Sequence, residues 1–211
     1  MSAAMKPILF STPMVQAILD GRKTMTRRVI NPDWIQSDKL PISLQADNGL
    51  WHFWSSGEHK SKYCIGDVLW VRETWCKGVL DGDATKYKEY WCIRQPKDSK
   101  RIFYKADCTE ETGYCDSDKL VKWKPSIFMP KEACRIFLRV TNVRVERLQD
   151  ITAHDIFQEG CVPLNSCSLK ECSGHAFNWW INLWNSINGK GAWEDNPYVF
   201  VYEFERVEKP C

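Results

Sequence analysis

The alternation of apolar and polar residues is clearest in the C-terminal half of the chain. Residues 134–148 alternate aliphatic side chains with arginines, and the alternation changes phase near Thr141 and Asn142. This pattern predicts one long strand that contains a bulge or a bend. Residues 198–207 also alternate, and we expect them to form the strand that closes the sheet.

Shorter patterns near the N-terminus predict a strand, a helix and further strands. Residues 7–10 are an apolar run and predict the first strand. Apolar residues within 12–20 recur three and four positions apart, as they do on one face of a helix, and Gly21 stands where a helix usually ends. The polar segment 24–30 and the alternating segment 68–73 predict two more strands.

Two more helices are expected after the long strand. Residues 152–155 have the spacing of a capping box, which predicts a short helix that runs to Glu159 and stops at Gly160. Residues 161–175 are interpreted as a loop. Residues 176–187 place large apolar side chains at helical spacing, so we expect an amphipathic helix packed on the β-structure.

The remaining sequence is irregular and falls in two blocks, residues 31–65 and 76–118. We interpret both as insertions into a single domain that spans residues 1–211, and a hairpin is one option for the first. A chain of 211 residues is long enough for one good hydrophobic core. The mixture of strands and helices predicts an α+β fold.

Composition and charge are ordinary, with 44% hydrophobic residues, 27% charged residues and a formal net charge of +2. Any attraction for nucleic acid must therefore come from a local cluster of cations. No segment has the order of a signal peptide, and no apolar run approaches the ~18 residues of a membrane-spanning helix. We expect a cytoplasmic protein whose ten cysteines are mostly reduced, with no membrane partner and no cofactor.

A dense polar run follows the first predicted helix. It contains four cations and two threonines, which are Arg22, Lys23, Thr24, Thr26, Arg27 and Arg28. The run fits a solvated basic turn, because cations suit the C-terminal end of a helix. It also fits a binding site for an anionic or polar ligand, in which the arginines and Thr24 contact that ligand.

The spacing of this run resembles the signature of ASCH domains, a helix followed by Gly-x-Lys-x-x-x-x-Arg, here at Gly21, Lys23 and Arg28. Residues 66–75 resemble the strand that follows in that family, and the overall layout is similar to bacteriophage and prophage ASCH proteins. The resemblance implies a PUA-like β-barrel with flanking helices. It also implies a nucleoside or nucleic acid as partner, RNA rather than DNA, because many ASCH domains were proposed to bind RNA.

Some small bacterial ASCH proteins are amidohydrolases that remove the acetyl group from acetylcytidine with a lysine, a threonine and a glutamate. The resemblance implies these catalytic roles for Lys23, Thr26 and Glu159 of this chain. A lysine with a lowered pKa can take the proton of a threonine hydroxyl and so activate it as a nucleophile. A structural ion pair beside a threonine that satisfies backbone groups is the alternative. This chain is much longer than those enzymes, so its extra segments could reshape the pocket.

Arg28, Arg72, Glu73 and Trp75 are candidates for the rim of the same pocket. The planar fork of an arginine suits a phosphate or a base edge, and a tryptophan offers a face for stacking. A cross-strand ion pair is the alternative for Arg72 and Glu73. The eleven tryptophans as a group are interpreted as core and insertion anchors, with one or two available to stack on a base or a sugar.

Cys161, Cys167, Cys172 and His175 are four potential zinc ligands within one short segment. Their spacing differs from that of a standard zinc knuckle, and ordinary loop thiols are the alternative. We expect no metal to be required.

Three functions therefore remain open. The first is hydrolysis of an amide on an acylated base such as acetylcytidine. The second is binding of RNA or DNA without chemistry. The third is a phage accessory protein that binds a host protein through the tryptophan-rich insertions.

Overall fold

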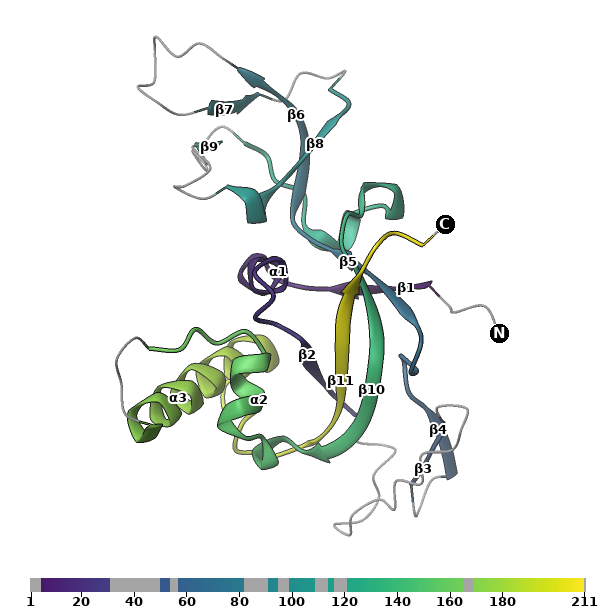
Figure 1. The fold of residues 1–211 in the computed structure, drawn as a ribbon, viewed down its shortest axis with the longest axis vertical. Helices are drawn as coiled ribbons and strands as arrows, with labels where there is room; N and C mark the ends of the chain where they lie inside the picture. The colour runs from purple at the N-terminus through teal and green to yellow at the C-terminus, as the bar shows by residue number, and fades with distance from the viewer. Residues whose placement is uncertain are drawn as a thin grey trace.

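The computed structural model describes residues 5–30, 50–53, 57–81, 91–94, 99–108, 114–115, 121–164 and 169–210. These residues form a five-stranded sheet, a four-stranded sheet, a two-stranded hairpin and three α-helices (Figure 1). The predicted α+β class is therefore confirmed. Within these ranges, no helix has both the length and the apolar character needed to cross a membrane.

The five-stranded sheet carries the residues of the candidate site. Its strands are, in spatial order, β1 (Met5–Leu9), β5 (Val68–Arg72), β10 (Phe137–Arg147), β11 (Tyr198–Val207) and β2 (Met25–Val29). β1 and β5 run parallel, and the other neighbouring pairs are antiparallel. β1 and β2 are the outer strands in this order, so no pairing between described residues closes the sheet into a barrel.

The two longest strands follow the sequence patterns closely. The register of β10 on β11 shifts between Val140 and Asn142, where the alternation in the sequence changes phase, so the predicted bulge is confirmed. β11 has its predicted bounds, but it lies between β10 and β2 rather than at an edge of the sheet.

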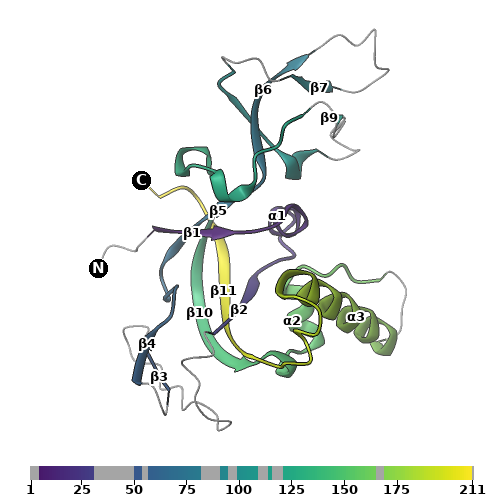
Figure 2. The ribbon, with the colours of Figure 1, turned by 180° about the vertical axis from the view of Figure 1, so that it is seen from behind.

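β11 is buried on both of its faces. Val199 and Val201 belong to a core shared with α2 and α3, whereas Phe200 and Tyr202 belong to a second core that includes residues of α1. A strand covered on both faces can be apolar at every position, which explains the continuous apolar run in its first half. In Figures 1 and 2, all three helices lie on the opposite side of the β10–β11 pair from the chain ends.

The first helix leads the chain into the site. α1 (Thr12–Leu19) ends before Gly21, which has a φ of +75° and allows a sharp turn into β2. After this turn the amide of Lys23 donates to the carbonyl of Ala17 at 2.9 Å, and the amide of Thr24 donates to the last residue of α2 at 2.8 Å. The basic run is therefore held between α1 and α2.

The other two helices pack against β2 and β11. α2 (Ala153–Gln158) begins with the predicted capping box, in which Thr152 and Asp155 each accept a hydrogen bond from the other's backbone amide. α3 (Leu169–Asn188) begins earlier than expected, because residues 169–175 continue the helix instead of forming a loop. That segment is polar and contains a glycine, so it carries no apolar periodicity from which a helix could be predicted.

Both predicted insertions contain β-structure. In the first, β3 (Leu50–Phe53) and β4 (Gly57–Lys60) form an antiparallel hairpin. In the second, a sheet in the order β8-β6-β7-β9 is made of β6 (Trp75–Asp81), β7 (Trp91–Arg94), β8 (Arg101–Tyr104) and β9 (Tyr114–Cys115). Figure 1 shows this sheet at one end of the molecule and the hairpin near the other. Residues 31–49 and 82–90 of the two insertions lie outside the described ranges.

Gly160, two residues after the end of α2, is packed closely against α1 and the segment that leads into β2. Gly160 has a φ of +108°, and a Cβ at this position would lie 2.9 Å from the Cβ of Ala17 and 3.4 Å from the Cβ of Lys23. Gly189, which follows α3, has the same φ, but a Cβ there would meet nothing within 4 Å. The two glycines therefore differ in packing and share their backbone conformation.

We expect Gly160→Ala to lower the free energy of unfolding by about 2–5 kcal/mol. About 1–2 kcal/mol comes from the positive φ and about 1–3 kcal/mol from overpacking against Ala17. Gly189→Ala is the matched control, and it loses only the backbone contribution of about 1–2 kcal/mol. Urea denaturation of both variants measures the difference, and equal losses would contradict the close packing.

Candidate functional site

Lys23 and Glu159 form the buried centre of the candidate site. The Nζ of Lys23 lies 2.6 Å from Oε2 of Glu159 and donates a second hydrogen bond to the Glu159 carbonyl oxygen at 2.9 Å. The two side chains are 0% and 2% exposed. The structure thus joins two predicted site residues that are 136 positions apart in the sequence.

Burial changes the acidity of this lysine. Loss of water lowers the pKa of the Lys23 ammonium below its ordinary value, while the Glu159 carboxylate opposes the change. The neighbouring cations Arg28 and Arg27 lower the pKa further. The neutral amine, which can accept a proton, is therefore easier to reach here than in a lysine on the surface.

Arg27 also contacts Glu159, but its charge is satisfied by the protein. Its guanidinium lies 2.6 Å from Glu146, 3.0 Å from Asp155 and 3.2 Å from Glu159. The same group lies 5.8 Å from the centre of the Trp180 ring, and the side chain is 0% exposed. Arg27 therefore fixes the Glu159 carboxylate and has little free capacity for a ligand.

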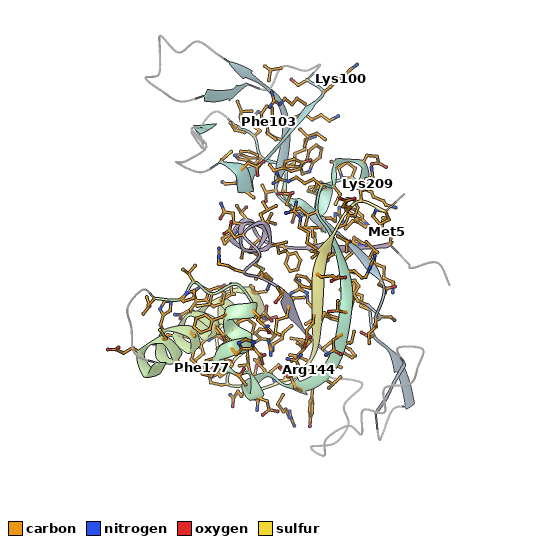
Figure 3. All side chains as sticks on the ribbon, in the orientation of Figure 1. Met5, Lys100, Phe103, Arg144, Phe177 and Lys209 are labelled. Carbon is orange, nitrogen blue, oxygen red and sulfur yellow. The ribbon has the colours of Figure 1, made fainter. Side chains whose placement is uncertain are left out.

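Arg144 on β10, which is labelled in Figure 3, extends the ionic network. Its Nε lies 3.0 Å from Oε2 of Glu146, and its other nitrogens contact Glu203 and, at 3.7 Å, Asp155. Two of the carboxylates that neutralise Arg27 are thus shared with a second arginine. This sharing connects β2, β10 and α2.

A cavity of about 640 Å³ opens beside the buried pair. Its wall includes residues of β1, β2, α1 and α3, among them Thr26, Arg27, Arg28, Glu159 and Trp180. Thr26 and Glu159 thus line the same cavity. Lys23 contacts Glu159 but is not among the described residues that line the cavity. The volume lies within the range of roughly 300–1,000 Å³ that small-molecule sites occupy.

Among the described hydrogen bonds, none joins Thr26 to Lys23. Thr26 lies on β2 opposite Tyr202 of β11 and is 1% exposed. The hydrogen bonds of the Lys23 ammonium run to Glu159. A proton transfer from Thr26 to Lys23 therefore requires a hydrogen bond beyond those described.

Arg28 is a partly buried cation with no carboxylate in ion-pair contact among the described residues. Its two terminal nitrogens donate to the carbonyls of Arg27 and Leu9, at 3.2 and 3.1 Å, and its guanidinium lies 5.6 Å from the centre of the Phe10 ring. Burial lowers the pKa of Arg28 from its ordinary value. The side chain also borders a second cavity of about 250 Å³, which Tyr63 lines as well.

The predicted rim residues Arg72, Glu73 and Trp75 diverge in the structure. Arg72 lines the cavity and donates to the carbonyl of Ile127. Glu73 is buried elsewhere and accepts two hydrogen bonds from Arg135, at 2.9 and 3.0 Å. Glu73 thus forms an ion pair with a residue that precedes the neighbouring strand β10, as the alternative interpretation expected, whereas Arg72 has no carboxylate partner among the described residues.

Trp75 and the first cation of the basic run also lie away from the cavity. Trp75 is 4% exposed and packs in a core with Phe137. Arg22 donates to the carbonyl of Gly160 at 2.6 Å and pairs with Asp20 at 2.8 Å. These contacts within the protein hold both side chains outside the described cavity lining.

Thr24 is likewise not among the described residues that line the cavity. Its carbonyl accepts a hydrogen bond from the amide of Phe204 at 2.8 Å, and its amide is bound to α2. Thr24 thus anchors the basic run, whereas Thr26, two positions later, faces the cavity.

The four potential zinc ligands are not assembled in the described part of the chain. Cys161 is buried, and burial raises the pKa of its thiol, which disfavours a thiolate. Cys172 is disulfide-bonded, and Nε2 of His175 lies 3.2 Å from the carbonyl oxygen of Val162. Cys167 lies outside the described ranges, within which no group of three or more His, Cys, Asp or Glu side chains could hold a metal.

The sequence analysis missed several aromatic residues of the site. Phe10, Tyr63 and Trp180 line the large cavity, and Tyr202 lines the smaller one. Burial raises the pKa of Tyr202 to about 12, so it remains a hydroxyl group. The indole N–H of Trp180 is buried and meets no acceptor among the described residues. Such an orphan donor on a cavity wall suits an acceptor atom of a ligand.

The lowered pKa of Lys23 predicts a pH dependence of stability. Between the folded-state pKa and 10.5, the unfolded state holds the lysine proton and the folded state has begun to release it. The free energy of unfolding therefore rises with pH across this window, and at lower pH the full unfavourable effect of burying the charge remains.

Lys23→Met removes this contribution, so the stability of the wild type relative to the variant should increase from neutral pH towards pH 10.5. Urea denaturation of both proteins at a series of pH values measures the difference. A relative stability that falls with pH would mean that attraction to Glu159 outweighs desolvation.

Comparisons of the chain with models of protein families, with curated proteins and with solved structures found no match. Support for a function therefore comes from the geometry of the cavity and from the residues that line it.

Proposed function

We propose that the chain is an ASCH-type protein whose cavity binds an acylated nucleoside and hydrolyses its amide bond. In this proposal the five-stranded sheet is the PUA-like β-structure, and its outer strand β2 carries Arg28, the end of the Gly-x-Lys-x-x-x-x-Arg run. Acetylcytidine is the model substrate. Closure of the sheet into a barrel would require pairing that involves residues outside the described ranges.

The buried Lys23–Glu159 contact of 2.6 Å beside a cavity that Thr26 also lines carries this proposal. Removing two charges from water is unfavourable, and replacing such a pair by apolar residues is often neutral or stabilising. A buried ion pair is therefore weakly explained by stability alone. A lysine with a lowered pKa, whose carboxylate partner lines the same cavity as a threonine, is better explained by proton transfer.

In the proposed reaction, the neutral amine of Lys23 takes the proton of Thr26 while the threonine oxygen attacks the acyl carbon. The resulting oxyanion is stabilised by the guanidinium of Arg28, which lines the same cavity. The intermediate collapses, the C–N bond breaks, and Lys23 returns the proton to the departing amino group. A water molecule, deprotonated by the same lysine, then hydrolyses the ester on Thr26.

The apolar part of the cavity suits the base of such a substrate. Phe10 and Trp180 offer aromatic faces, and Leu183 and Ile187 of α3 complete this side. Stacking of a base on an aromatic ring contributes about 1–3 kcal/mol and tolerates different bases. The unpaired indole N–H of Trp180 would then donate to a carbonyl oxygen or ring nitrogen of the base.

We expect Thr26→Ala to lower kcat/KM for acetylcytidine by at least about 100-fold, because the nucleophile is lost. Thr24→Ala is the matched control, since this threonine lies two positions away and outside the cavity lining. Its kcat/KM should stay within about threefold of wild type. The rate of cytidine release, measured by chromatography, gives kcat/KM for both variants. Equal activity of wild type and Thr26→Ala would remove Thr26 from the mechanism, and no release by the wild type would reject this substrate.

Binding of nucleic acid without chemistry is the second candidate, and it is favoured because the described hydrogen bonds of the Lys23 ammonium run to Glu159 and not to Thr26. In that case the affinity for single-stranded RNA should fall steeply with salt, and Arg28→Gln should weaken binding and flatten the salt dependence. Fluorescence anisotropy at several salt concentrations measures both effects. Binding that ignores ionic strength would argue against this candidate.

The third candidate, an accessory protein that binds a host protein, depends on the tryptophan-rich insertions. Trp34 and Trp54 of the first insertion lie outside the described ranges. The geometry of the described residues therefore gives this candidate no specific support.

A further inference from the structure

Three cations line the cavity together with residues of β1. Arg28 donates to the carbonyl of Leu9, and Leu9 is paired in register with Arg72 of β5. Lys62 also lines the cavity, and the hydroxyl of its neighbour Tyr63 donates to the carbonyl of Pro7 at 2.8 Å. We call Arg28, Lys62 and Arg72 the β1 cation cluster.

Arg27 and Lys6, which lie near the β1 cation cluster, are neutralised by carboxylates. Within the described residues, the cations of the cluster have no such partner. Arg27 contacts three carboxylates, and Lys6 on β1 pairs with Asp67 at 2.6 Å. The cluster residues instead contact carbonyl oxygens and aromatic rings. The described wall of the cavity contains one carboxylate, that of Glu159, and it is already shared by Lys23 and Arg27.

One donor of the cluster also lacks a partner. The Nε atom of Arg72 is buried, and no described residue accepts a hydrogen bond from it. The hydroxyl-bearing residues Thr74 and Ser126 line the same cavity. Unpaired cationic donors combined with hydroxyl groups suit a phosphate, which has several acceptor oxygens and a negative charge.

We propose that Lys62 and Arg72 of the β1 cation cluster bind the phosphate monoester of the ligand while Arg28 remains at the acyl group, so that the substrate class is a mononucleotide rather than a nucleoside. This inference rests on the proposed function for the position of the base, which lies towards Thr26 and Trp180. Arg28 stands between the two parts of the cavity because it follows Thr26 on β2 and reaches Leu9 on β1. A cavity of about 640 Å³ suits a small ligand of this kind.

Isothermal titration of the full chain with cytidine 5′-monophosphate and with cytidine tests the inference. Neither probe carries an acyl group, so no turnover occurs. The wild type should bind the monophosphate at least about tenfold more tightly than cytidine at low salt, because charge-assisted hydrogen bonds are added. The ratio of the two affinities should shrink at high salt, where exposed charges are screened.

Lys62→Gln and Arg72→Gln should each reduce this ratio about three- to tenfold. Lys62 is exposed, so its variant tests the inference even if Arg72→Gln does not fold. Arg139→Gln is the matched control, because Arg139 is an exposed arginine of β10 that faces Glu205 and lies outside the cavity lining. Its ratio should equal that of the wild type.

Equal affinities of the wild type for the two probes, or an unchanged ratio in the Lys62 variant, would overturn the inference and leave the proposed nucleoside site standing. Tighter binding of oligocytidylate than of the monophosphate would also overturn it, in favour of a polymer groove. If cytidine does not bind but inorganic phosphate protects the wild type and not the Lys62 variant against thermal unfolding, the phosphate site stands and the proposed function fails.

Discussion

The ion pair between Lys23 and Glu159 is the contact on which the site depends. Lys23 offers two hydrogen bonds to one residue, and both carboxylate oxygens of Glu159 are held by cations. Removing one partner of a buried pair leaves an uncompensated charge and costs about 3–5 kcal/mol. The pair therefore locks the start of β2 against the end of α2, and the position of Thr26 and Arg28 on the cavity wall follows from that attachment.

Two adjacent arginines of β2 have opposite roles, because successive side chains of a strand point to opposite faces. Arg27 turns towards α2 and α3, where carboxylates surround it and fix its geometry. Arg28 turns towards β1, where it finds carbonyl groups and an aromatic ring and keeps its charge available. Arg27 thus stabilises the packing of β2 against its neighbours, whereas Arg28 adds positive charge to the cavity wall.

The strands could be predicted from sequence because their periodicity is strong, as the phase change near Asn142 demonstrates. The pairing order could not, since alternation within β11 does not reveal that both of its faces are covered. Lys23, Thr26 and Glu159 were found through a motif. Phe10, Tyr63 and Trp180 were missed because an apolar residue that lines a cavity looks the same in sequence as one that fills a core.

The order of the strands also determines when the cavity can exist. β2 precedes β11 by most of the described sequence, and among the described residues β11 is the strand with which it pairs. Contacts between segments so distant in sequence form late, because the intervening chain must first be brought together. Until β11 has been synthesised, the basic run therefore stays without this sheet partner, and a chain that lacks residues 198–207 cannot hold β2 in the five-stranded sheet.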